Sequence, residues 1–220
     1  MAAVWQQILF LRFPFEPWLR ASVSYRVFGL LQGWRGGSLL LQWAEPLGAM
    51  ILCVLLVAAP FVSTTLIGFL LLACAGYWIL LSLSDLPLGR VTGIHLLVAL
   101  YGGIAAIATG LSPVKGAALS GLVQLLLYLI FFAFCARVLR SPKILAAVIW
   151  VYLMVSLVVS GYGIRQEFFG VEQLATWNDP LSEFANDTRV YSYLGNPNLL
   201  AGYLLGAIAF SGVAMLIWRT

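Results

Sequence analysis

The chain has 220 residues, of which 62% are hydrophobic and only 9% are charged. A water-soluble domain carries about 25% charged residues, so the composition excludes an ordinary soluble protein and predicts an all-α, multi-pass membrane protein whose main partner is the lipid bilayer. We interpret the net charge of +4 as a sign of orientation in the membrane, not of nucleic-acid binding.

Residues 1–43 are predicted to lie on the cytoplasmic face as an amphipathic segment. Charged residues interrupt every apolar run in this region well before the length of about 20 residues that a membrane span needs. One face of a predicted interfacial helix is apolar, with Val23, Val27, Leu30, Leu31 and Trp34 at helical spacing. The same spacing also fits a cytoplasmic helix packed on the bundle, and both interpretations stay open.

Residues 44–220 are predicted to form a transmembrane domain of about six spans. No charged residue lies between Glu45 and Asp85, which leaves room for two spans joined at residues 60–65, where Pro60 and several hydroxyl side chains interrupt the pattern. Four further spans are predicted between charged residues, within 90–115, 115–137, 143–165 and 189–219. The predicted fold is therefore a polytopic helix bundle.

Lys and Arg residues predict the orientation of this bundle. If the N-terminus is inside, only Lys115, Arg165 and Arg189 of the twelve Lys and Arg residues fall on the outer side. Cytoplasmic loops carry the excess of these residues, so we expect an inner (plasma) membrane protein with both termini in the cytoplasm. The one long outer loop then covers residues 165–192.

Few polar groups fall inside the predicted spans. His95 is a candidate intramembrane ionisable residue, although a neutral imidazole hydrogen-bonded within the bundle is the alternative. The three cysteines lack the spacing of a metal site, and we predict neither a metal nor a cofactor. Gly202 and Gly206 form a small-xxx-small pattern, which is typical of close helix packing.

The segment after the outer loop is the most distinctive part of the chain. Gly195 and Pro197 predict irregular backbone before the last span. We predict an anion or substrate site here, made of cations, neutral donors and the positive end of a helix: Arg189, Tyr191, Tyr193, Asn196 and Asn198, with Arg165 and Lys115 as the other outward cations. The alternative is that the two asparagines only cap the helix.

Several stretches of the chain resemble a known family. Residues 77–86, 108–118, 172–177 and 189–201, together with the aromatic amino terminus, are similar to the cyanobacterial IctB family of proposed bicarbonate (inorganic carbon) transporters. That family in turn resembles the O-antigen ligase and polymerase superfamily, with which it shares a Gly-Asn-Pro-Asn element, here residues 195–198. Members of the family are longer, so the resemblance implies that this chain corresponds to their N-terminal half.

Three functions follow from the resemblance and the composition. The first is bicarbonate transport, and the second is transfer of glycans from polyprenyl-diphosphate-linked donors. A transferase would need a base to activate the acceptor hydroxyl, and no such catalytic residue is identifiable. The third is an accessory role beside a partner membrane subunit or a missing C-terminal half.

Overall fold

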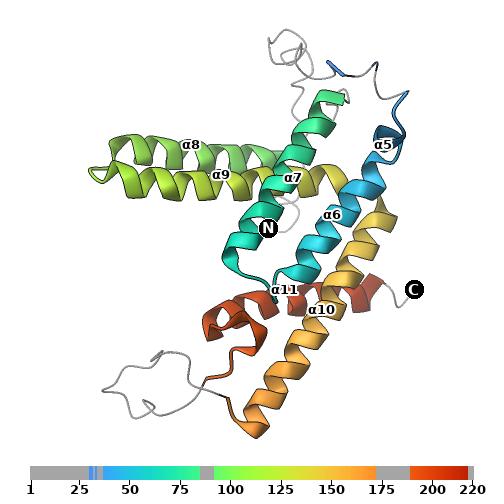
Figure 1. Ribbon diagram of the computed structural model, residues 1–220, viewed down its shortest axis with the longest axis vertical. Coiled ribbons are helices and arrows are strands. Elements are labelled where there is room, and N and C mark those ends of the chain that lie inside the picture. The colour runs from blue at the N-terminus through green and yellow to red at the C-terminus, as the bar shows by residue number, and fades with distance from the viewer. Residues whose placement is uncertain (1–29, 32, 34–36, 85–91, 172–188, 218–220) are drawn as a thin grey trace, which may run out of the picture. The chain divides into compact units, whose positions relative to one another are not determined.

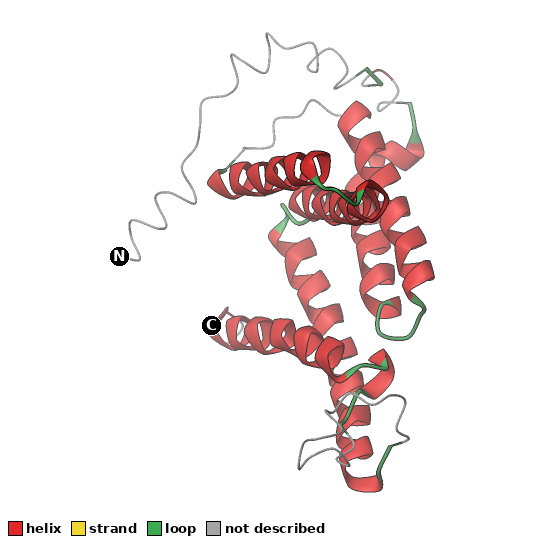
Figure 2. Ribbon diagram, turned by 90° about the vertical axis from the view of Figure 1, so that its left-hand side faces the viewer, coloured by secondary structure: helices red, strands yellow, loops and turns green. Residues whose placement is uncertain are grey.

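The computed structural model describes residues 30–31, 33, 37–84, 92–171 and 189–217. Throughout these residues the regular secondary structure is helical (Figure 2), which confirms the all-α prediction. The elements are α5 (Leu39–Gln42), α6 (Ala44–Ala58), α7 (Thr64–Ser84), α8 (Gly93–Leu111), α9 (Lys115–Val138), α10 (Pro142–Phe169), the 3₁₀ turn η1 (Ser192–Leu194) and α11 (Pro197–Ile217). The predicted interfacial helix and most of the outer loop lie outside the described residues.

Five of these helices are long and apolar enough to cross a membrane. They are α7 to α11, with lengths of 19 to 28 residues, which correspond to about 28 to 42 Å at 1.5 Å per residue. Helix α6 has 15 residues and rises about 22 Å, less than the roughly 30 Å of hydrocarbon. The described residues therefore contain the apolar helices that the sequence predicts, five of spanning length and one shorter helix.

The surfaces of these helices support a lipid environment. Among the 19 residues of α8, only Gly93 is buried, whereas Leu100, Ile104 and Ile107 expose 60%, 57% and 65% of their surface. Such a surface is unfavourable in water, and hydrocarbon chains would cover it without requiring a protein partner. The described chain has the character of a multi-pass membrane protein.

The chain divides into two compact units, residues 1–51 with 68–140 and residues 52–67 with 141–220. In the first unit, α8 and α9 run side by side as an antiparallel hairpin (Figure 1). The turn between them is closed locally, because the Ser112 hydroxyl accepts a hydrogen bond of 3.2 Å from the Val114 amide. Leu129 approaches Gly102 across the hairpin, where a larger residue would contact its side chain.

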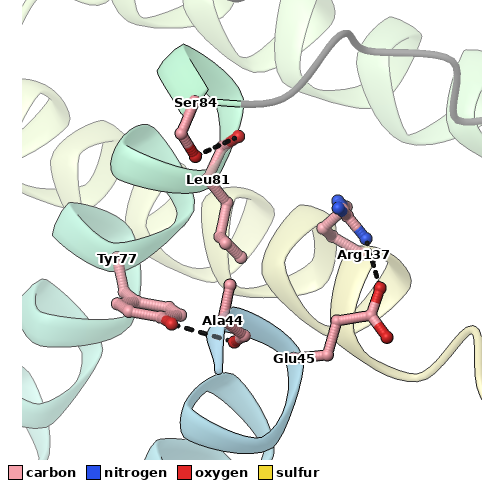
Figure 3. A network of polar contacts seen from close by, with 6 residues as sticks. All are labelled: Ala44, Glu45, Tyr77, Leu81, Ser84 and Arg137. Atoms are coloured by element: carbon pink, nitrogen blue, oxygen red, sulfur yellow. Dashed lines mark hydrogen bonds and ion pairs between the residues drawn. The ribbon is translucent and has the colours of Figure 1, made fainter. Parts of the chain in front are cut away.

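A polar network joins α6, α7 and α9 in the same unit (Figure 3). The Tyr77 hydroxyl donates to the Ala44 carbonyl at 2.8 Å, and Arg137 pairs with Glu45 at 3.5 Å. Gly48 allows the close approach of Val138, whose Cγ2 would lie 2.8 Å from an added Cβ. These contacts fix the N-terminal end of α6 against the C-terminal end of α9.

The second unit is organised around α10, η1 and α11. Its core contains Val155 and Val159 of α10 and Leu200 of α11. Helix α11 begins at Pro197, whose fixed φ suits the first helical position. Asn196 precedes it as a cap, because its side-chain oxygen accepts the Asn198 amide at 2.8 Å.

Candidate functional site

Helix α10 continues beyond the point where the sequence predicts the outer loop to begin. It ends at Phe169, so Arg165 and the residues after it belong to the last turns of a helix. Gly170 ends it with φ of 75°, a positive value that glycine adopts without a Cβ penalty. The predicted outer loop, residues 165–192, therefore begins with the last turns of this helix, where Gln166 makes contacts that stabilise the helical conformation.

Gln166 is the polar centre of this region, and only 4% of its surface is exposed. Its side-chain oxygen accepts the Ser192 amide at 2.7 Å and the Tyr191 amide at 3.3 Å, while its nitrogen lies 3.5 Å from the Ser192 carbonyl oxygen. Backbone groups in an irregular segment have no helical partner. The Gln166–Ser192 contact supplies that partner and fixes the segment before α11 against α10.

Ser192 completes this contact from the other side. Its hydroxyl donates to the Val159 carbonyl at 2.7 Å, and its side chain is buried. Its φ is 52°, the left-handed region that residues other than glycine rarely adopt. That conformation costs about 1 kcal/mol, and the hydrogen bonds around Ser192 offset the cost.

Arg189 lies beside the first turn of α11. Its guanidinium donates to the Asn198 side-chain oxygen at 3.4 Å, and both residues are exposed. A cation next to a helix N-terminus is electrostatically unfavourable by itself, because the helix end carries a partial positive charge. An anion in front of Arg189 and this helix end would interact favourably with both.

The two tyrosines of the predicted site have different surroundings. Tyr191 binds Gln166 through its backbone amide. Tyr193 instead stacks on Tyr162 of α10, with ring centroids 4.3 Å apart and an interplanar angle of 21°. The ring of Phe61 meets Tyr193 edge-on, at 4.9 Å. The sequence predicts the same role for both tyrosines, as neutral donors. In the structure Tyr191 contributes its backbone amide and Tyr193 contributes its ring.

The three cations of the predicted site have different neighbours. Arg189 is at the start of α11, whereas the Arg165 guanidinium lies 5.9 Å from the ring centroids of both Tyr162 and Phe169. Lys115 belongs to the other unit, where its ammonium group donates to the Gly110 carbonyl and closes the α8–α9 turn.

His95 caps helix α8. Its Nδ1 lies 2.8 Å from the Thr92 hydroxyl and accepts the Thr92 amide at 3.3 Å. The ring lies 5.6 Å from Phe132 of α9.

The glycines of the small-xxx-small pattern differ in their contacts. At Gly206 an added Cβ would lie 2.7 Å from the Tyr152 hydroxyl oxygen, whereas nothing lies within 4 Å of a Cβ at Gly202. Tyr152 is held in place because its hydroxyl donates to the Tyr203 carbonyl at 2.7 Å. Gly206 is thus the position where α10 and α11 approach closely.

Sequence reasoning did not single out Gln166, Ser192 or Tyr162. Gln166 stands between Arg165 and Glu167, a pattern typical of a solvated loop. One feature of the sequence did point weakly to Gln166: it is an uncharged amide at the end of a long apolar run. Backbone groups that are buried near the end of a membrane span need hydrogen-bond partners, and an amide side chain can supply them.

Within the described ranges, no group of three or more His, Cys, Asp or Glu side chains is placed to hold a metal ion. No protein-family model, no curated protein and no solved structure matches the chain.

Proposed function

We propose that this protein is a multi-pass protein of the inner membrane, with both termini in the cytoplasm, that takes part in moving bicarbonate across the bilayer. Its anion-binding element is Arg189 together with the first turn of α11. Support comes from the five helices of spanning length and from the resemblance of residues 189–201 to the IctB family.

The observation that carries the proposal is the position of Arg189. Its guanidinium lies 3.4 Å from the Asn198 side-chain oxygen, next to the N-terminal end of α11, which carries a partial positive charge. Two positive features lie side by side with no carboxylate paired to Arg189 in the part of the chain that the structure describes. This arrangement favours a small anion, which a fixed guanidinium can bind through two parallel N–H groups.

Transport of an anion requires compensation for its removal from water. Secondary carriers use helix ends and cations for this purpose, at points where the backbone is irregular. The irregular segment here comprises Tyr191, η1 and Gly195, whose φ of 68° is left-handed. The Gln166–Ser192 contact keeps this segment in a single conformation, so the anion would meet a preformed site.

Uptake of radiolabelled bicarbonate by vesicles containing the purified protein tests the proposal. Arg189→Gln removes the cation but keeps a hydrogen-bonding side chain. We expect uptake at low bicarbonate to fall about tenfold, the effect of losing about 1.4 kcal/mol of anion binding. Lys143→Gln is the matched control, because it removes a positive charge from the first turn of α10; its uptake should match the unmodified protein.

Equal losses in the two variants would contradict the anion site. If the vesicles take up no bicarbonate but the protein transfers sugar from a polyprenyl diphosphate donor, the glycan-transfer function is correct instead. If neither activity occurs with the purified chain, and uptake requires a second membrane protein, the chain is an accessory subunit.

A further inference from the structure

Aromatic rings and one arginine gather where α10 ends, and the ring and cation contacts that join them, within the part of the chain that the structure describes, involve neither Arg189 nor Asn198. We define this aromatic cluster as Phe61, Tyr162, Phe169 and Tyr193 with Arg165. Tyr193 contacts two of the other rings. It stacks on Tyr162, with ring centroids 4.3 Å apart, and meets Phe61 edge-on, with ring centroids 4.9 Å apart. The rings come from the α6–α7 turn, α10 and η1, so tertiary structure creates the cluster.

Arg165 lies over two of these rings. Its guanidinium carbon is 5.9 Å from the centroids of Tyr162 and Phe169, one turn before and one turn after it on α10. The rings stabilise the positive charge through their faces. The guanidinium N–H groups, which point outward in its plane, have no hydrogen-bond or ion-pair partner among the described residues. Glu167 is not placed to pair with it, since residues two apart on a helix face different directions.

The position of Arg165 along α10 identifies what surrounds it. The chain between Lys143 and Arg165 carries no charge, and this stretch rises about 31 Å, close to the roughly 30 Å thickness of the hydrocarbon layer. Arg165 therefore lies at the boundary with the headgroups. Phe168 and Phe169, just beyond it, expose 79% and 81% of their surface, as expected of rings in the interfacial layer.

We propose that the aromatic cluster binds the headgroup of an anionic phospholipid, with the Arg165 guanidinium holding the phosphate. At headgroup depth the phosphate is the abundant acceptor, and its geometry matches the paired N–H groups of arginine. Phe168 and Phe169 would enter the layer between headgroups and acyl chains. This inference does not depend on bicarbonate transport, because it uses neither Arg189 nor the start of α11.

Photolabelling by a headgroup-reactive phospholipid tests the proposal. The full-length protein is placed in nanodiscs of phosphatidylglycerol or phosphatidylcholine that contain a trace of the reactive lipid, and labelled residues are mapped by mass spectrometry. We expect labelling of residues 162–169 to be several-fold higher in phosphatidylglycerol. Arg165→Gln should reduce it about tenfold, the consequence of losing about 1.4 kcal/mol. Arg165→Lys should give an intermediate value, because lysine keeps the charge but not the planar pair of donors.

Lys143→Gln is the control, since it changes the charge at the other end of α10 and should leave labelling of residues 162–169 unchanged. If Arg165→Gln does not yield a folded protein, Tyr162→Leu and Phe169→Leu each remove one ring and keep the charge; both should lower the labelling several-fold. Labelling that is unaffected by all of these substitutions overturns the proposal. Competition by inorganic phosphate alone would overturn it as well, because the site would then bind free phosphate instead of lipid.

Discussion

The α8–α9 hairpin and the α10–η1–α11 segment each contain two apolar helices, but the polar contacts that stabilise them differ in sequence separation. In the hairpin the polar groups bind near neighbours: the Lys115 ammonium donates to Gly110 and the Gln124 amide to Tyr128, four or five residues apart. Between α10 and α11 the partners are 25 to 51 residues apart in sequence. The hairpin is therefore stabilised by local contacts, whereas the conformation of the segment before α11 depends on contacts between residues far apart in sequence.

Burial follows the same division. Helix α8 has one buried residue, while α10 buries six, including the polar side chains of Ser156 and Gln166. A surface that faces lipid tolerates exchange of one apolar residue for another, since hydrocarbon adapts to either. A buried polar contact does not, because removing one partner leaves the other unsatisfied. Substitutions should therefore have much larger effects in the second region than in the hairpin.

The two glutamines provide the sharpest test of this difference. Gln166→Ala leaves the buried amides of Tyr191 and Ser192 without their acceptor, and we expect the free energy of unfolding to fall by about 3 kcal/mol. Gln124→Ala removes an exposed bond to Tyr128, four residues away, and should change it by less than about 0.5 kcal/mol. Reversible unfolding in mixed micelles measures both values, and similar values for the two variants would contradict the comparison.

The glycines give the next largest effect. Gly206→Ala would place a Cβ 2.7 Å from the hydroxyl of Tyr152, whose ring cannot move without breaking its bond to Tyr203; we expect a loss of about 2 kcal/mol. At Gly102 the close atom is the flexible end of Leu129, so Gly102→Ala should cost less than about 1 kcal/mol.

Gly202→Ala is the control for this series, because the position is open and alanine favours the helix by about 0.5 kcal/mol. The order of stability should be Gly202→Ala, then Gly102→Ala, then Gly206→Ala, as measured by the same unfolding equilibrium. A Gly206→Ala protein as stable as Gly202→Ala would show that α10 and α11 do not approach closely at Tyr152.

Ser192 gives a smaller expected effect than Gln166 or Gly206. Ser192→Ala loses the bond to Val159 but keeps the strained φ of 52°, so stability should fall by about 1 kcal/mol. Ser192→Gly loses the same bond but relieves about 1 kcal/mol of strain, so it should be close to the unmodified protein. Thermal melting of the two variants compares them, and a glycine variant that melts below the alanine variant would contradict the left-handed conformation.

The helices of this protein are predictable from local patterns, and their boundaries are less so. Long runs of apolar residues between charges predicted α7, α8, α9 and α11 within a few residues, because hydropathy and helix formation depend on residues close in the chain. The end of α10 was not predicted, since Gln166 gains its stabilising partners from Ser192 and Tyr191, outside any local window.

Within the candidate site, residue types suggested the chemistry but not the grouping. The two arginines, Arg165 and Arg189, and the asparagine cap before α11 were recognisable from the chain alone, as polar groups at the end of an apolar run. Tertiary structure decided that Arg189 joins Asn198 while Arg165 joins Tyr162 and Phe169. Membrane insertion depends on the hydropathy of each continuous segment, so the sequence alone determines it. A hydrogen bond between α10 and η1 instead requires the chain between them to close into a loop. Only the folded arrangement therefore determines which partners meet.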